Sequence, residues 1–146
     1  PSFSKLEVGF SMNRRLELEM RAIFYVGAGS FIGGILRYAL SAWIYKILSN
    51  PWFPYGTLAV NTLGCLAIGF LAGLGETRGV FTPDARLFLF VGLLGGFTTF
   101  SSVALETLWL ARGFQSLAAV SNIGLQLFSG LMAVWIGNLF GRFVGA

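Results

Sequence analysis

The chain has 146 residues, of which 55% are hydrophobic and only 11% are charged, and its formal net charge is +4. A soluble domain typically carries about 25% charged residues, so this composition excludes an ordinary soluble enzyme and favours a single membrane domain. The sequence has no histidine and a single cysteine, Cys65. It therefore excludes histidine metal sites, histidine proton relays and an intrachain disulfide, and Cys65 is interpreted as a small apolar residue.

The first 19 residues are polar and lack the small-residue cleavage site of a signal peptide. Met12 and Met20 are both candidate natural starts. We therefore interpret residues 1–19 as a leader or tag-like extension and expect it to be poorly structured. Residues 20–146 are predicted to form one all-α membrane domain with four transmembrane helices.

Four apolar stretches are long enough to cross a bilayer, which takes about 20 apolar residues. These stretches cover residues 22–48, 56–75, 85–110 and 116–140. The connections between them are short. Pro51 and Pro54 separate the first helix from the second. Thr82, Pro83 and Asp84 begin the third helix as its N-cap, a first-turn proline and a first-turn acid. Any function therefore takes place within the bilayer, and no basic face remains for nucleic acid.

Each predicted helix carries glycines spaced four residues apart, which lets membrane helices approach closely. These pairs are Gly29/Gly33, Gly69/Gly73, Gly92/Gly96 and Gly137/Gly141. We expect tight packing that a partner chain completes, because four short helices enclose little space for a solvated path.

Basic residues show only a small bias toward one end of the predicted bundle. If the N-terminus is cytoplasmic, four arginines lie inside and two cations lie outside, which is a small bias under the positive-inside rule. The inner group is Arg21, Arg78, Arg86 and Arg142, and the outer group is Lys46 and Arg112. A chain that inserts in both orientations can form an antiparallel dimer.

The third stretch contains the unusual run Gly95-Gly96-Phe97-Thr98-Thr99-Phe100-Ser101-Ser102. Glycine favours departures from helical geometry, and bare backbone at membrane depth has to line a polar cavity or be buried in protein. We therefore predict that the third helix is broken near its middle. Because the run is uncharged, its hydroxyls and backbone suit a site for a small ion better than acid–base chemistry.

Several other polar residues lie at membrane depth, where they suggest function by default. Asn61 can donate two hydrogen bonds to an anion or can join helices. Arg37 can concentrate anions at a pore mouth or can pair with a headgroup or carboxylate. Glu106 is expected to cap the helix or pair with a basic side chain.

In the fourth stretch, Asn122, Gln126, Ser129 and Gly130 are spaced to share one helix face. This polar face could line a path, and the alternative is a hydrogen-bonded helix interface. Amide and hydroxyl donors, the positive edges of Phe97 and Phe100, and the charge of Arg37 all favour an anion. The backbone carbonyls of the broken helix favour a structural cation nearby.

Three motifs in order identify a resemblance that extends from about residue 20 to the C-terminus. Gly34-Ile35-Leu36-Arg37-Tyr38, Gly56-Thr57-Leu58-Ala59-Val60-Asn61, and the run from Gly92 to Ser101 closely resemble the CrcB/Fluc fluoride channels. The resemblance implies passive export of fluoride that entered as HF. It also implies an antiparallel, dual-topology homodimer with two pores in a bacterial inner membrane, which confers fluoride resistance.

The resemblance also assigns roles to residues of this chain. Arg37 matches the vestibule arginine, and Gly95 and Thr98 match the positions whose carbonyls hold a central sodium ion. The pore positions are matched by Asn61, Phe100, Ser101, Ser102, Val103, Asn122, Gln126 and Ser129. Val103 departs from the family, which has a second pore phenylalanine there, and the assignments in the fourth helix are loose by about one residue.

Two other functions compete with the fluoride channel. A small multidrug or guanidinium exporter is also a small four-helix, dual-topology protein, but it needs an embedded acid in its first helix, which this chain lacks. A structural or assembly protein would use all of these polar residues as packing contacts. None of the three functions is enzymatic.

Overall fold

The protein is described by a computed structural model that covers residues 3–49 and 51–146, with side chains from residue 14 onward. Its described residues form helices and no strand. Four segments are long and apolar enough to cross a membrane: Arg14–Ile47, Tyr55–Arg78, Pro83–Arg112 and Ser116–Gly145. The helices are α1 (Phe3–Ile47), α2 (Tyr55–Arg78), α3 (Pro83–Arg86), η1 (Leu87–Leu94), α4 (Gly95–Phe97), α5 (Phe100–Arg112) and α6 (Ser116–Gly145).

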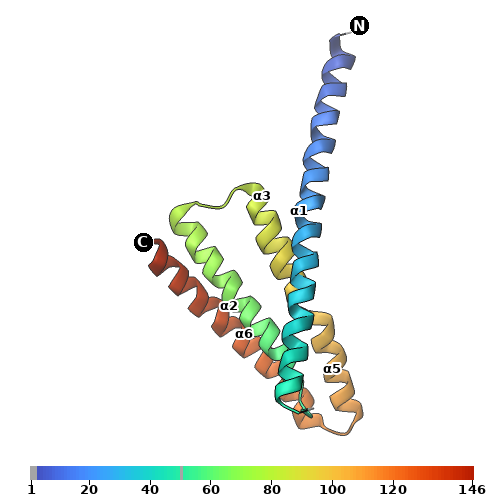
Figure 1. The fold of residues 1–146 in the computed structure, drawn as a ribbon, viewed down its shortest axis with the longest axis vertical. Coiled ribbons are helices and arrows are strands. Elements are labelled where there is room, and N and C mark those ends of the chain that lie inside the picture. The colour runs from blue at the N-terminus through green and yellow to red at the C-terminus, as the bar shows by residue number, and fades with distance from the viewer. Residues whose placement is uncertain (1–2, 50) are drawn as a thin grey trace.

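Helix α1 begins at Phe3, well before the start expected near residue 22. The backbone of the expected 1–19 extension is therefore helical from Phe3, and α1 projects far beyond the other helices (Figure 1). Residues 1–2 of that extension lie outside the described residues. The division of the chain into an extension and a membrane domain at residue 19 stays a prediction.

The helices form two pairs that diverge from a common end (Figure 1). Helix α2 packs along α6, and α1 packs along η1 and α4. Helix α5 lies at the closed end of this arrangement and packs against α6.

The glycine spacing predicted close helix packing, and the structure confirms it. On α2, a Cβ at Gly69 or Gly73 would collide with the backbone of Val134 or Asn138 on α6. On α6, Gly137 and Gly141 stand in the same relation to the backbone of α2, and Gly29 and Gly33 of α1 to that of η1 and the residues after it. Only a residue without a Cβ allows two helix backbones to approach this closely.

The third membrane segment is broken, as predicted, but the break lies at two threonines. Gly95 keeps helical backbone angles, φ −64° and ψ −37°. Thr98 and Thr99 are extended, with φ −83° and ψ 156° and with φ −150° and ψ 118°. The adjacent Gly96 serves close packing instead, because a Cβ there would lie 2.7 Å from the carbonyl oxygen of Ser30.

The basic residues counted for orientation lie at the two ends of the bundle, whereas Arg37 lies beside the break in the third segment. The N-terminal end of the bundle includes the α2–α3 connection and the C-terminus, while the α1–α2 and α5–α6 connections lie at the opposite end (Figure 1). At the first end Arg21 pairs with Asp84 at 2.6 Å and Arg142 pairs with Glu76 at 2.6 Å. Thr82 caps α3 as expected, accepting a hydrogen bond from the Ala85 N–H at 3.2 Å.

Candidate functional site

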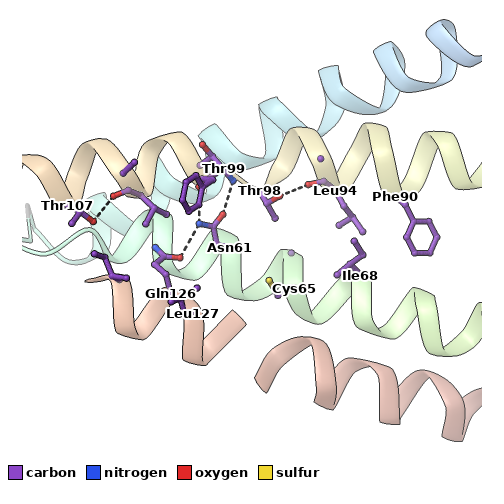
Figure 2. Close-up of a pocket in the computed structure, with 16 residues that line it drawn as sticks. Asn61, Cys65, Ile68, Phe90, Leu94, Thr98, Thr99, Thr107, Gln126 and Leu127 are labelled. Carbon is purple, nitrogen blue, oxygen red and sulfur yellow. Dashed lines mark hydrogen bonds between the residues drawn. The ribbon is translucent and has the colours of Figure 1, made fainter. Parts of the chain in front are cut away.

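A hollow of about 700 Å³ lies between α2, the third membrane segment and α6 (Figure 2). Its lining is largely apolar, and polar side chains interrupt it at five positions: Asn61, Thr98, Thr99, Thr107 and Gln126. Of the predicted pore residues, Asn61, Phe100, Val103 and Gln126 border this hollow, as do the predicted cation-site residues Gly95 and Thr98. The predicted residues that do not border it are Arg37, Ser101, Ser102, Asn122 and Ser129.

Asn61 binds the broken backbone at two points. Its Oδ1 accepts a hydrogen bond from the Thr99 N–H at 2.8 Å, and its Nδ2 donates to the Thr99 carbonyl at 3.1 Å. The same Nδ2 also donates to Gln126 Oε1 at 3.1 Å (Figure 2). Asn61 thus replaces helical hydrogen bonds that the extended threonines give up, as backbone groups at membrane depth require.

This contact has a consequence for Gly95. In a regular α-helix the Thr99 N–H would donate to the Gly95 carbonyl four residues earlier. Because Asn61 receives that N–H, the Gly95 carbonyl loses its helical donor. Gly95 is also exposed on the surface of the single chain, so its carbonyl is suited to a cation.

Arg37 approaches the same region from α1. Its Nη1 donates to the Thr98 carbonyl at 3.5 Å, the outer limit of a hydrogen bond. Arg37 therefore lies beside the break and not on the hollow. Among the described residues, no three cysteine, aspartate or glutamate side chains are close enough to hold a metal ion.

Thr99 also starts α5. Its side chain accepts a hydrogen bond from the Ser102 N–H at 3.3 Å, which makes it the N-cap of that helix. The same hydroxyl lies 3.2 Å from Ser101 Oγ and 3.1 Å from Ser102 Oγ. The hydroxyls of Ser101 and Ser102 therefore belong to the cap, where they remain close to the break.

Phe100 and Val103 lie on the same helix and differ strongly in exposure. Phe100 is 83% exposed in the single chain, whereas Val103 is 6% exposed. Both still border the hollow. An aromatic ring this exposed on a membrane helix is available to lipid or to another chain.

The polar residues of α6 bind α2 and α5. Gln126 accepts from Asn61, and the Ser129 hydroxyl lies 2.9 Å from that of Thr62. Asn122 is fully buried, and its Nδ2 donates to Thr107 Oγ1 at 2.9 Å. Asn122 and Ser129 thus have the geometry of the interface alternative, and Gln126 alone of the three lies on the hollow.

Glu106 accepts a hydrogen bond from Thr57 Oγ1 at 2.5 Å. The sequence predicted that Glu106 caps its helix or pairs with a basic side chain. The prediction of a basic partner is wrong, because the partner is the hydroxyl of Thr57. The reason is that Thr57 is the polar group that α2 presents at this depth. Glu106 does not border the hollow.

Sequence reasoning missed the threonines that complete these contacts. Thr57, Thr62 and Thr107 each pair with a polar side chain on another helix. A spacing signal was available, because Thr57 lies four residues before Asn61 and Thr107 lies four residues after Val103, which places each pair on one helix face.

Residues 24–138 match the family model described as CrcB-like protein, Camphor Resistance (CrcB). A protein of Flavobacterium psychrophilum named "Fluoride-specific ion channel FluC" is 39% identical over 123 residues, covering 84% of this chain and 98% of the relative. A Methylobacillus flagellatus protein of the same name is 42% identical and covers 81% of this chain and 92% of the relative. "Fluoride-specific ion channel FluC 1" of Methanosarcina acetivorans is 37% identical, covering 82% and 90%.

Proposed function

Because the chain belongs to the CrcB-like protein family, we propose that it is a fluoride-selective ion channel that lets cytoplasmic fluoride leave the cell passively. The similarity to relatives named fluoride-specific ion channels carries this proposal, since it spans most of this chain and nearly all of each relative. These relatives are named as channels and not as enzymes, so the activity to measure is transport.

The chemistry of the hollow supports an anion. Its polar side chains are amides and hydroxyls, which can donate hydrogen bonds, and no carboxylate is among its lining residues. Glu106, the acid embedded in α5, binds Thr57 away from the hollow. A cation or multidrug exporter needs an embedded carboxylate on its path, and the described lining offers none.

The setting is a membrane crossed several times, and we place the protein in the bacterial inner membrane. Four arginines at one end and Lys46 and Arg112 at the other give a weak orientation bias. Two of those arginines pair with carboxylates, which reduces the net charge at that end. We therefore propose dual topology, with antiparallel copies forming a homodimer.

A second copy would complete what the single chain leaves open. The hollow is bordered by only three helical segments, and Phe100 at its edge is 83% exposed. A twofold dimer repeats every feature of one chain in the other, so it would contain two hollows and two fluoride paths. Labelling of single introduced cysteines from each side of the membrane tests the dual topology that an antiparallel dimer needs. A single exclusive orientation would contradict that dimer.

The broken helix fits a structural sodium ion at the centre of such a dimer. Gly95 offers a carbonyl without its helical donor, and Thr98 offers a carbonyl that, among the described residues, accepts only a long hydrogen bond of 3.5 Å from the Arg37 guanidinium. Carbonyl oxygens of this kind replace the hydration shell of an alkali cation. A bound cation supplies fixed positive charge, which would raise the local concentration of an anion.

Fluoride efflux from proteoliposomes, followed with a fluoride electrode, tests the proposal. We expect rapid fluoride efflux and almost no chloride efflux from liposomes loaded with either salt. Folded, reconstituted protein that releases no fluoride would remove the channel function. Appreciable chloride current would contradict the selectivity.

A further inference from the structure

Arg86 differs from the three other arginines at its end of the bundle. Arg21 and Arg142 each pair with a carboxylate at 2.6 Å, and Arg78 donates to two backbone carbonyls at the C-terminal end of α6, at 3.0 and 3.3 Å. Within the described part of the chain, Arg86 makes no ion pair and no side-chain hydrogen bond, and it is exposed. Its positive charge is therefore left without a fixed counter-charge.

The two acids of the bundle at this end do not supply that counter-charge. Asp84 lies two residues before Arg86 on α3, but it accepts a hydrogen bond from Arg21 at 2.6 Å. Glu76, near the end of α2, accepts one from Arg142 at 2.6 Å. Each of these pairs has no net charge, so neither acid cancels the field of Arg86.

Arg86 lies where the hollow continues toward the membrane surface. On the third membrane segment it lies four residues before Phe90, which borders the hollow. On α2, Gly75 lies seven residues after Ile68, which also borders the hollow, and a spacing of seven returns to the same helix face. A Cβ at Gly75 would lie 4.0 Å from Arg86 Nη2. The guanidinium therefore reaches from the third segment to α2, in line with the hollow and beyond its lining.

An aromatic side chain narrows the same end. A Cβ at Gly75 would lie 2.9 Å from the ring of Phe81, which belongs to the connection between α2 and α3. Phe81 also meets Phe90 edge-on, with ring centroids 5.8 Å apart. Apolar walls beside a charge focus its field toward the open side. An anion that approaches this end therefore meets the charge of Arg86 before it meets the apolar hollow.

We propose that Arg86 captures fluoride at the α2–α3 end of the hollow and raises its local concentration there before it enters the path. This inference rests on the proposed channel function. Arg37 does not serve this end, because its guanidinium contacts the Thr98 carbonyl at the break in the third segment. The two arginines thus act at different depths, with Arg86 at the mouth and Arg37 beside the break.

A charge series at position 86 tests the capture. Arg86→Lys keeps the charge, Arg86→Gln removes it and Arg86→Glu reverses it. The proteins are reconstituted in liposomes of zwitterionic lipid, because anionic lipid adds a surface potential of its own. At low fluoride and about 0.01 M ionic strength, where the Debye length is about 30 Å, we expect Arg86→Lys to conduct like the unchanged protein. Initial fluoride efflux should fall by about fivefold in Arg86→Gln and by about tenfold or more in Arg86→Glu.

Salt gives a readout that a merely structural role would not move. At about 1 M potassium gluconate the Debye length is about 3 Å, so we expect all four proteins to conduct within about twofold of one another. A loss of efflux in Arg86→Gln that persists at this salt concentration would overturn capture by charge.

Arg15→Gln is the matched control, because it removes the same charge on the same side of the bundle. Arg15 lies six residues before Arg21 on α1, which places it about 9 Å further along the helix that projects from the bundle. We expect its efflux at low ionic strength to stay within about twofold of that of the unchanged protein. A loss equal to that of Arg86→Gln would overturn the assignment to Arg86, since any charge at this end would then do the same.

The outcomes separate this inference from the channel function. If the unchanged protein releases no fluoride, the channel function fails and the inference fails with it. If the unchanged protein conducts, and Arg86→Gln and Arg86→Glu conduct equally well at low ionic strength, only the inference is overturned. If these variants do not fold, the unchanged protein decides, and fluoride efflux that is independent of ionic strength overturns the inference.

Discussion

Helix α2 meets α6 in two different ways along its length. In its first half, Asn61 and Thr62 reach Gln126 and Ser129 through hydrogen bonds of 3.1 and 2.9 Å. In its second half, Gly69 and Gly73 face the α6 backbone so closely that a Cβ would collide with it. Polar side chains therefore join the two helices in the half that borders the hollow, whereas glycines bring the two backbones into contact in the other half.

The α2–α6 pair thus combines close backbone packing in one half with polar contacts beside a hollow in the other. Packing without side chains at one end fixes the two helices relative to one another, since the backbones themselves are in contact. At the other end, amide and hydroxyl groups border a largely apolar hollow. If the two halves have these separate roles, substitutions in the glycine half should lower stability, and substitutions in the polar half should lower fluoride efflux.

Gly137→Val should disrupt the glycine half. Its Cβ would collide with the Leu66 carbonyl on α2, and overpacking of this kind costs about 3 kcal/mol at its upper end. We expect a large loss of folded protein and of flux together, seen by size-exclusion chromatography and thermal unfolding. Gly124→Ala on the same helix is the control, because a Cβ there meets nothing within 4 Å; equal losses in both variants would contradict the prediction.

Asn61→Asp should disable the polar half without disrupting the glycine half. The carboxylate keeps an acceptor for the Thr99 N–H but loses both donors, and its charge repels an anion by roughly 4 kcal/mol at close range near a protein surface. We expect fluoride efflux to fall by about a hundredfold or more in protein that still elutes normally. Unchanged efflux would count against any role for Asn61 in the path.

Val103→Phe introduces the aromatic residue that the resemblance to the family predicts at this position. Val103 is 6% exposed but borders a hollow of about 700 Å³, which offers room for a ring. We expect efflux to rise severalfold, with a change in unfolding free energy within about 1 kcal/mol. Slower efflux in a stable variant would show that the valine is adapted to this hollow.

Thr62→Val should have the smallest effect. It removes one hydroxyl pair with Ser129, and hydrogen bonds between membrane helices contribute about 0.6 kcal/mol on average. We expect a slight decrease in stability and efflux within about twofold of the unchanged protein. A severe loss of efflux at normal stability would move the Thr62–Ser129 pair from packing into the fluoride path.

The fold could be predicted well because its signals are local. Runs of about 20 apolar residues predicted the four membrane segments, and the Gly-x-x-x-Gly pairs predicted which faces pack closely. The break in the third segment was also predicted, but the reason given for it was the flexibility of the glycines. It lies at Thr98 and Thr99 because Asn61, from another helix, supplies the hydrogen bonds that their extended backbone needs.

The site could be predicted only as a set of residue types. The sequence placed Asn61, Phe100, Val103 and Gln126 among the pore candidates, and the structure places these four on one hollow. It could not show that Asn122 would find Thr107, or that Glu106 would find Thr57 in place of a basic residue. Such partners depend on how helices distant in sequence are rotated against one another.

By itself, the sequence determined that this is a four-span membrane protein with closely packed helices and a third span that is broken within an uncharged run. Hydropathy, glycine spacing and family motifs are properties of the chain, so they can be read without a structure. Only the tertiary structure decided which polar side chains are hydrogen-bonded to one another, because that depends on which donor meets which acceptor across α2, α5 and α6. Asn61 is bound by the broken backbone and by Gln126, and that contact turns the Gln126 nitrogen away from Asn61.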